Sequence, residues 1–554
     1  MNDKPVRDVY AHLSNSYGRN HYEIDRPLHQ LLTYFSGTVP KLSKLGDFVG
    51  KELYEISDYV DKIGNPKIIT WGMNGERVDE AWLDPAERWA LERLVKEFGV
   101  NKRAYRGGNW FDHYTSIYLI ADPGLACILT LTNQTAYALF KYGSSSQKKV
   151  IASLIGEEED LEFGATWFTE IQGGSDLGSN VVRANKDKGD KWTINGDTKY
   201  FASDAGLADY ALVTARPSNG AQGAKGLALF LVPRLTSLSD KNFRITRLKD
   251  KSATRNVPTG EVEFRDSEAE VIGEPGKGIY YVMENLTLSR IANSMGALGL
   301  ARKAYLEAYY FAQKRTSFGK PLIEHPLIQR DLLDMEVWIE GALALALKTI
   351  YQFQKSWKES IAKSSLYDYT RILTHISKNL SSEMSSEVTK MAMELHGGIG
   401  FLSEFPIERL HREALVTPIW EGGSNIQALD MLEAIGKGAA VTLLEDLRSI
   451  SATVGTDRDL AQSCLDNIGS TLSLLDSEEA QKPRQDEFTE FIAKDILNSL
   501  GHNTATILLL AAGSSLKEPR FTFAGKYYFS RFIKHEIPTK MNISQVRNFI
   551  AIDR

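Results

Sequence analysis

The sequence predicts an α+β fold that is mostly α, in which one strand-rich segment interrupts a helical chain. Apolar residues recur at helical spacing before about residue 160 and again after Gly276. Between these stretches, turn residues separate short β-branched and aromatic runs, and such consecutive strands favour a β-barrel or sandwich. We therefore expect an N-terminal helical domain at 1–160, a middle β-domain at 161–276, a helical bundle at 277–440 and a C-terminal helical extension at 441–554.

The N-terminal segment contains a compact helix-start signal. Asp84 can cap a helix, Pro85 suits its first position, and Glu87 has the spacing of a capping box. Apolar residues then follow at helical spacing, namely Leu91, Leu94, Val95 and Phe98. This pattern predicts an amphipathic helix.

The middle segment contains a hairpin signal and several strand-like runs. Asn195-Gly196 lies between two such runs, and this dipeptide is typical of a two-residue turn. Further strands are expected at 210–216, 226–232 and 260–264.

Long helical patterns return after the middle segment. They cover about 279–314, 326–357 and 366–395, and they predict an up-and-down bundle. In the C-terminal extension, one buried helix face is expected from Leu465, Ile468, Leu472 and Leu475.

Composition and cysteine usage limit the class of protein. With 43% apolar residues, 25% charged residues and a net charge of −6, the chain has the composition of a soluble globular protein. No apolar run reaches the roughly 18 residues of a membrane span, and the polar start lacks the apolar core of a secretory signal. Cys127 and Cys464 form no CxxC motif, and the histidines form no HxxxH or HExxH pair. We expect a cytoplasmic protein with no metal site.

Two glycine-rich stretches are only superficially similar to nucleotide-binding motifs. Gly296–Ala301 lies inside a helical pattern with no strand before it, so its small residues are expected to let two helices pack closely. Gly273–Gly278 lacks the Walker spacing and is expected to form a turn between domains. Since the chain also has no GxSxG elbow, nicotinamide, ATP and serine-hydrolase chemistry are not indicated.

The stretch Thr169–Asp176 offers the chemistry of a ligand-binding loop. Its unhindered backbone N–H groups lie beside the hydroxyls of Thr169 and Ser175. Such donors suit a planar ring rich in acceptors, such as isoalloxazine. The alternative is a polar loop that only leads into the β-domain.

A second, distant segment combines a glycine turn with a lone acid. After Gly397-Gly398 the chain continues to Glu421, which two glycines follow and which Ile419 and Trp420 precede. Glycine frees the backbone to direct its N–H at a ligand. The apolar neighbours favour a partly desolvated carboxyl, whose pKa rises toward that of a useful base. The alternative is an acid in a surface loop.

Five separated motifs together resemble the acyl-CoA dehydrogenase superfamily in their order and spacing. They fall within about 160–440 and read TEIQGGSD at 169–176, KYFAS at 199–203, RTSFG at 315–319, HGGIGF at 396–401 and IWEGGSN at 419–425. The AidB-like branch of this family is the more similar one, because of Trp71–Asp79, Leu248–Lys251 and the extra C-terminal helices.

The resemblance implies an FAD held between the β-domain and the bundle. It assigns cofactor contacts to Phe168, Thr169, Gly174, Ser175, Phe201, Ser203, Arg315, Phe318, Gly397, Gly398, Gly423 and Asn425. The first four would contact the isoalloxazine, with the next two flanking its other side. Arg315 would reach the pyrophosphate of FAD in a neighbouring subunit, and Gly397 and Gly398 would lie along the same path. The resemblance therefore also implies a homo-oligomer, a dimer of dimers.

Glu421 falls where the catalytic base of the family usually lies. Some members carry this acid on the first long bundle helix, where the present chain has Ser289, which cannot serve. The resemblance implies that Glu421 removes the α-proton of an acyl-CoA thioester while a hydride leaves the β-carbon for flavin N5, forming an α,β-double bond. The electron acceptor is not indicated.

Several positions depart from the mainstream dehydrogenases. Glu394 replaces the usual Gln, Gly423 the usual Thr after the catalytic Glu-Gly, and Phe201 the Trp beside the flavin. These changes concern substrate handling rather than flavin binding. His396 also differs, and we expect it to be a satisfied core histidine.

The C-terminal extension is split in charge, which leaves a second function open. Residues 441–516 carry 5 Lys or Arg and 12 Asp or Glu, whereas 517–554 carry 8 and 3. The basic end, rich in aromatic residues, could contact DNA, or it could pack on the bundle and pair with the acidic half. The alternative function is therefore an AidB-like DNA-associated flavoprotein with weak dehydrogenase activity. An acyl-CoA oxidase is less favoured, because the loop reads GSD.

Overall fold

The computed structural model describes residues 13–187, 191–359, 364–475, 487–539 and 541–552. The chain forms two compact units, each assembled from separate stretches of sequence. The strand unit consists of Glu55–His113 and Asp122–Ala292, and the bundle unit of Met1–Tyr54, Tyr114–Ala121 and Asn293–Arg554. The predicted domain boundaries near residues 160, 276 and 440 stay predictions.

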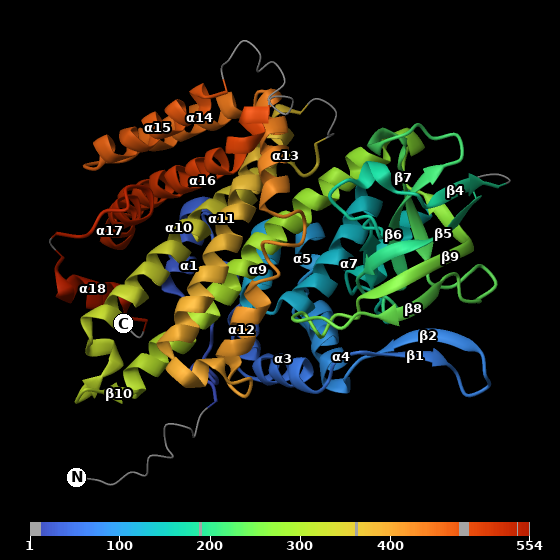
Figure 1. Ribbon diagram of the computed structural model, residues 1–554, viewed down its shortest axis with the longest axis horizontal. Helices are drawn as coiled ribbons and strands as arrows, with labels where there is room; N and C mark the ends of the chain where they lie inside the picture. The colour runs from blue at the N-terminus through green and yellow to red at the C-terminus, as the bar shows by residue number, and fades with distance from the viewer. Residues whose placement is uncertain (1–12, 188–190, 360–363, 476–486, 540, 553–554) are drawn as a thin grey trace, which may run out of the picture. The chain divides into compact units, whose positions relative to one another are not determined.

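The strand unit contains a mixed sheet of seven strands, which confirms the predicted strand-rich middle segment (Figure 1). The strands are β3 (Gly164–Trp167), β4 (Arg183–Lys186), β5 (Lys191–Ala202), β6 (Tyr210–Pro217), β7 (Ala228–Pro233), β8 (Arg244–Leu248) and β9 (Gly260–Val271). Neighbouring strands pair in the order β6-β4-β5-β9-β7. Strand β7 also pairs with β6, so these five strands form a closed ring. Strand β3 is added to β6 in parallel and β8 to β9 in antiparallel orientation.

Strand β6 explains the continuous apolar runs of the middle segment. Ala211, Val213 and Ala215 lie in one buried cluster with side chains of the other strands. Leu212 lies in a second cluster, which includes residues of helix α7 (Pro123–Tyr142). Because successive side chains of a strand point to opposite faces, β6 is buried on both of them.

The hairpin predicted at Asn195-Gly196 is wrong. Strand β5 continues through the dipeptide, and its register with β9 shifts there. Asn195 Nδ2 donates to Asp266 Oδ1 at 3.0 Å, and Asn195 Oδ1 accepts from the Asp266 N–H at 2.9 Å. A Cβ at Gly196 would lie 2.8 Å from Val182 Cγ2, so the glycine permits a bulge against a close neighbour rather than a turn.

The helix-start signal at Asp84 is confirmed, whereas its capping box is not formed. Helix α4 spans Pro85–Glu92, and Asp84 Oδ1 accepts a backbone N–H of its first turn at 2.8 Å. Glu87 is instead buried, and its carboxyl oxygens have no hydrogen-bond partner among the described residues. An unpredicted hairpin, formed by β1 (Lys67–Trp71) and β2 (Arg77–Trp82), lies just before α4, and its turn contains Asn74-Gly75.

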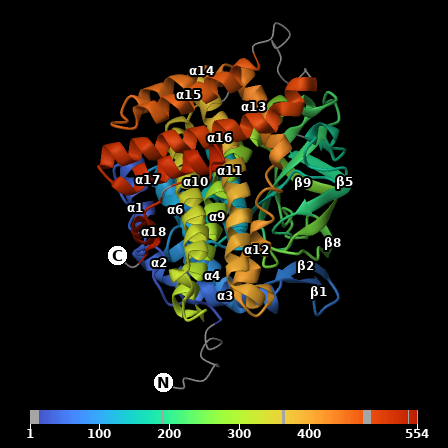
Figure 2. The same cartoon turned by 60° about the vertical axis from the view of Figure 1, so that its left-hand side comes forward.

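Long helices form the centre of the bundle unit, and their limits match the predicted ones closely. They are α9 (Gly278–Lys314), whose first part belongs to the strand unit, α10 (Pro326–Ser356) and α11 (Ser365–Leu395). Figure 2 shows α10 and α11 side by side, with α16 (Glu487–Leu516) lying across them. Proline in the first turn of α10 has a fixed φ that suits a helix start, and the start of this helix could therefore be predicted from the sequence.

Shorter helices complete the bundle unit. They are α1 (Arg26–Ser36), α2 (Ser43–Gly50), α12 (Pro406–Ala414), α13 (Ser424–Gly436), α14 (Ala439–Ser451), α15 (Arg458–Ser473), α17 (Pro519–Tyr528) and α18 (Ile543–Ile550). The apolar face predicted for the C-terminal extension is buried along α15 and just beyond it. A Cβ at Gly341 of α10 would lie 2.3 Å from the Tyr528 ring, so glycine allows α17 to approach closely.

The helix-packing interpretation of Gly296–Ala301 is confirmed. A Cβ at Gly299 would lie 2.0 Å from the carbonyl oxygen of Tyr118 in α6 (Trp110–Ile120). Any larger residue would therefore push α9 and α6 apart.

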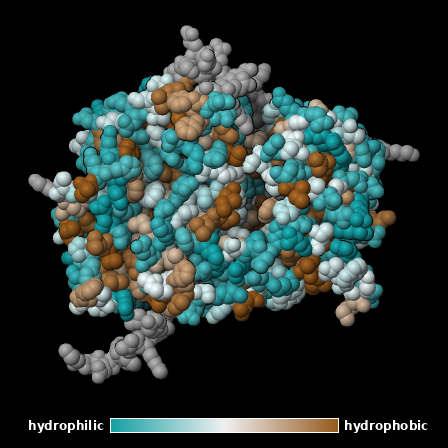
Figure 3. Space-filling view, viewed as in Figure 1, coloured by the Kyte–Doolittle hydropathy of each residue, from teal (hydrophilic) through white to brown (hydrophobic). Residues whose placement is uncertain are grey.

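The helices of the described residues are not long and apolar enough for any of them to cross a membrane. On the face drawn in Figure 3, hydrophilic and apolar side chains are interspersed.

Candidate active site

The turn that follows β3 presents backbone donors that the protein itself does not use. Within the described residues, the N–H groups of Thr169, Gly174 and Ser175 have no hydrogen-bond partner. Gly174 and Ser175 are exposed and Thr169 is half-buried. A Cβ at Gly174 would lie 2.5 Å from Thr169 Oγ1, so the turn folds tightly on itself. These N–H groups are therefore available to a ligand.

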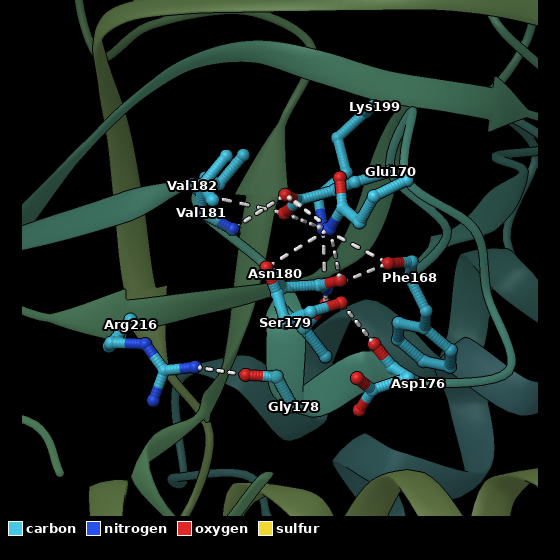
Figure 4. Close-up of polar contacts among 12 residues, drawn as sticks. Phe168, Glu170, Asp176, Gly178, Ser179, Asn180, Val181, Val182, Lys199 and Arg216 are labelled. Atoms are coloured by element: carbon cyan, nitrogen blue, oxygen red, sulfur yellow. Dashed lines mark hydrogen bonds and ion pairs between the residues drawn. The ribbon is translucent and has the colours of Figure 1, made fainter. Parts of the chain in front are cut away.

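A buried ion pair lies directly behind this turn (Figure 4). Lys199 Nζ lies 3.0 Å from Glu170 Oε1, and both side chains are 0% exposed. Burial lowers the pKa of Lys199 to about 8, against the opposing effect of Glu170. For Glu170, burial acts to raise the pKa, but Lys199 and the N–H of Val181 bring it below its ordinary value. Sequence reasoning missed this pair, because polar residues so far apart give no pairing signal.

The end of β5 lies against the same turn. The N–H of Tyr200 donates to the Thr169 carbonyl at 3.2 Å, and Trp167 Nε1 donates to the Ser203 carbonyl at 2.8 Å. The Phe201 ring is 52% exposed and lies 4.9 Å from Lys249 Nζ. These contacts place the segments around Thr169 and Ser203, which the family resemblance assigned to the isoalloxazine, next to each other within the strand unit.

Glu421 lies in a strained loop of the bundle unit, immediately before α13. Its φ is +57°, in the left-handed region that non-glycine residues rarely adopt. Its side chain is half-buried, Gly423 is the N-cap residue of α13, and Asn425 is exposed in the first turn of that helix. The unusual backbone sets the direction of the Glu421 side chain.

Buried polar side chains hold this loop in place. Gln427 Nε2 donates to the carbonyls of Glu421 at 3.0 Å and Gly422 at 2.8 Å, and Lys378 Nζ donates to the Gly422 carbonyl at 2.9 Å. His375 Nδ1 in turn lies 2.9 Å from Gln427 Oε1. These three side chains are buried, and none of them stood out in the sequence. They compensate a local strain of roughly 1–3 kcal/mol.

The position of the alternative base is occupied by an inert side chain. Ser289 is buried in α9, and its hydroxyl lies 3.2 Å from the Leu286 carbonyl oxygen, which accepts its hydrogen. An alcohol held in this way cannot accept a proton at neutral pH.

The glycine turn after α11 is open, as its predicted role requires. Gly397 has a φ of +66°, and a Cβ added at Gly397 or at Gly398 would meet no atom of the described residues within 4 Å. His396 is buried, stacks on Phe311 at 4.4 Å between ring centroids, and its Nδ1 lies 2.7 Å from the Ala392 carbonyl. Burial lowers its pKa. His396 is therefore the core histidine that the sequence predicted.

Arg315 and Phe318 lie on the hairpin that joins α9 to α10. Its strands are β10 (Thr316–Ser317) and β11 (Lys320–Pro321). Phe318 is 96% exposed with a φ of +48°, and Arg315 is also exposed. An aromatic ring presented in this way by a strained turn is suited to contact another molecule.

The basic C-terminal segment packs on the bundle, as one of the two sequence interpretations proposed. Phe521 and Tyr528 are 0% exposed. Ion pairs join Arg520 to buried Glu336 and Glu340, Arg531 to Asp334, and Lys526 to Asp457 of the acidic half. These aromatic rings cannot stack on bases, and these cations already have protein partners.

Comparison with known proteins identifies the family. The acyl-CoA dehydrogenase middle-domain model matches residues 165–267, and the acyl-CoA dehydrogenase C-terminal-domain model matches residues 276–436. The putative acyl-CoA dehydrogenase AidB of Escherichia coli is 29% identical over 398 residues, covering 68% of this chain and 71% of that protein. Cyclohexane-1-carbonyl-CoA dehydrogenase of Geobacter metallireducens is 31% identical over 288 residues, covering 51% of this chain and 70% of that enzyme.

A solved structure shares the fold over most of the chain. ACDH-11 of Caenorhabditis elegans, in complex with C11-CoA, gives a TM-score of 0.80 at 23% identity, covering 93% of this chain and 91% of that one. The chain belongs to the acyl-CoA dehydrogenase family. This membership supports an oxidoreductase.

Proposed function

We propose that the chain binds FAD and oxidises an acyl-CoA thioester to its α,β-unsaturated product. The observation that carries this proposal is the set of unused N–H donors at Thr169, Gly174 and Ser175, found within the described residues. Isoalloxazine presents its acceptors along one edge of a flat ring, and fixed backbone donors match such an edge without further reorganisation. The residues of the turn therefore fit the cofactor that the family implies.

The remaining cofactor contacts follow from the same proposal. Phe201, at the end of β5, and Ser203, just after it, flank the ring, and Gly423 and Asn425 are further cofactor contacts. Gly397 and Gly398 lie along the pyrophosphate path of the cofactor of a second copy. Arg315 and Phe318 reach the cofactor of a second copy, and their exposure supports this role. The chain then functions as a homo-oligomer.

Glu421 is the proposed catalytic base. When bound, FAD supplies the acceptor for the hydride that leaves the β-carbon of the substrate. Glu421 takes the α-proton at its carboxylate, and hydrogen bonds to the main chain of Glu421 and Gly422 hold the backbone that carries this side chain. Such preorganisation is effective because a base in position acts without a search for geometry.

The substrate class is an acyl-CoA thioester. Support comes from the acyl-CoA dehydrogenase relatives and from the acyl-CoA named in the ACDH-11 complex. Chain length and electron acceptor are left to experiment.

Titration of the cofactor-free protein with FAD tests the proposal. We expect one FAD per chain, with quenching of flavin fluorescence and a structured flavin absorption band. Gly174→Val should weaken binding at least tenfold, because its side chain would displace Thr169. Gly469→Val, at an open position on α15, is the control. Wild-type protein that takes up no FAD would refute the proposal.

A further inference from the structure

A buried polar network fixes the peptide bond between Phe168 and Thr169 (Figure 4). Asn180 Nδ2 donates to the Phe168 carbonyl at 2.9 Å, and Lys199 Nζ donates to the same oxygen at 3.2 Å. Asn180 and Lys199 are 2% and 0% exposed. Two donors, one of them charged, therefore hold this carbonyl toward the interior of the strand unit.

The opposite end of that peptide group faces the other way. The described residues contain no cis peptide bond, and in a trans peptide the C=O and the N–H point in opposite directions. Because the Phe168 carbonyl points at Asn180 and Lys199, the Thr169 N–H points away from them. This is one of the N–H groups without a partner in the part of the chain that the structure describes.

The network is itself anchored to several strands. Thr214 Oγ1 of β6 accepts from Asn180 at 3.0 Å and from Lys199 at 3.1 Å. Glu170 Oε2 accepts the N–H of Val181 at 2.7 Å. The turn, the segment before β4, β5 and β6 thus share one set of hydrogen bonds.

An arrangement of this kind is poorly explained by stability alone. Burying an ion pair removes two charges from water, and apolar residues of similar volume often stabilise a fold as well or better. The pair instead orients the groups of the turn, because each donor and acceptor in the network forms a hydrogen bond with a particular atom.

We infer that Asn180 and the Lys199–Glu170 pair are positioning residues of the cofactor site, which aim the Thr169 N–H at an acceptor of the flavin ring. This inference rests on the proposed FAD binding. None of the three side chains touches the cofactor in this scheme, and each acts through the peptide group between Phe168 and Thr169.

The first test uses Asn180→Asp, which replaces the donor with a carboxylate oxygen that repels the Phe168 carbonyl. We expect FAD affinity to fall at least about tenfold, as for loss of a hydrogen bond to a polarised group, with a shifted flavin absorption maximum. Asn185→Asp makes the same change at an exposed position of β4 and should alter neither quantity. The thermal midpoint of the cofactor-free protein monitors folding.

A second variant keeps the inference testable where Asn180→Asp does not fold. The double variant Glu170→Gln, Lys199→Met removes the ion pair without changing its net charge, so a shift in flavin reduction potential would report altered hydrogen-bond geometry. We expect such a shift together with weaker FAD binding. Folded variants with FAD affinity within about twofold of wild type and an unchanged spectrum would overturn the inference and leave the proposed function intact. Wild-type protein without FAD affinity would overturn both.

Discussion

Two carboxyl groups of the strand unit are buried without a hydrogen-bond partner among the described residues, those of Glu87 and Asp204. Burial raises the pKa of Asp204 from 3.8 to about 8, although Lys251 opposes the shift. Burial also raises the pKa of Glu87, and nearby Asp122 adds to the effect. The folded state then binds the Asp204 proton more tightly than the unfolded state. The contribution of this proton to the stability of the folded state is therefore full at acidic pH, and it is lost as the pH rises toward 8.

Asp204→Asn should remove this pH dependence. We expect the variant to be more stable than wild type at pH 8 by about 1–3 kcal/mol, because the amide has no charge to bury and no proton to retain, and the advantage to shrink at pH 5. Asparagine also tolerates the φ of +60° found at this position. Thermal unfolding at the two pH values measures the effect, with exposed Asp240→Asn as the control. A variant no more stable than wild type at pH 8 contradicts the assignment.

The hydrogen bonds from Gln427 that hold the Glu421 loop should affect turnover more than FAD binding. Gln427→Leu removes the donors to the Glu421 and Gly422 carbonyls. Because small displacements of a catalytic group are costly, we expect kcat to fall about 10- to 100-fold while FAD content stays unchanged. Gln462→Leu, on the exposed face of α15, is the matched control. An unchanged kcat in Gln427→Leu would mean that the Gln427 hydrogen bonds do not position the base.

Among single residues, those of the candidate site that form contiguous motifs could be proposed from the sequence, and their roles stay predictions. The turn at Thr169–Asp176 and the Glu421 loop were recognisable because their glycines and acids are adjacent in the chain. The roles of Lys199, Gln427 and His375 could not be predicted, because the sequence does not distinguish a buried polar side chain from an exposed one. Only the fold reveals that their partners surround them.

Among the helices and strands, the helices were predicted well and the strand connections less well. Helices α10 and α11 carry long apolar periods and clear start signals, including a Ser364 side chain that caps α11. Asn195-Gly196 is a dipeptide typical of turns, but hydrogen bonds between Asn195 and Asp266 of the neighbouring strand accompany a bulge at this position. The β1–β2 hairpin was missed although its turn contains Asn74-Gly75, because its strands are short and adjacent acidic residues interrupt the second one.

Arg520 supplies ion pairs at the junction of α17 with α10. Arg520 Nη2 lies 2.6 Å from Glu336 and 2.5 Å from Glu340, and its Nη1 donates to the Phe549 carbonyl at 2.6 Å. Arg520→Met would leave two buried carboxylates without this partner.

We expect this variant to lose up to about 3–5 kcal/mol of unfolding free energy in the bundle unit, because removing one partner of a buried ion pair is strongly destabilising, while Glu336 keeps its ion pair with Arg302. Chemical denaturation followed by circular dichroism measures the loss. Lys437→Met, which breaks a largely exposed pair with Glu433, should change stability by less than about 1 kcal/mol. A loss of similar size in both variants would contradict a special role for Arg520.

For the molecule as a whole, the question is whether the basic C-terminal segment binds DNA. Lys526 and Arg531 are engaged with Asp457 and Asp334. We therefore expect Lys526→Ala, Arg531→Ala to change duplex affinity by less than about threefold and to leave its salt dependence unchanged. Fluorescence anisotropy at several salt concentrations provides the measurement. A tenfold loss with a shallower salt slope would instead favour the DNA-associated function.

The proposed chemistry depends on Glu421 removing a proton from an acyl-CoA bound beside FAD. The decisive experiment mixes FAD-loaded protein anaerobically with a panel of acyl-CoAs and follows the flavin absorbance. We expect bleaching in the wild type and in the exposed control Glu445→Gln, and a rate at least about 100-fold lower in Glu421→Gln. Bleaching of Glu421→Gln at the wild-type rate, or no bleaching of the wild type by any member of the panel, would contradict this role.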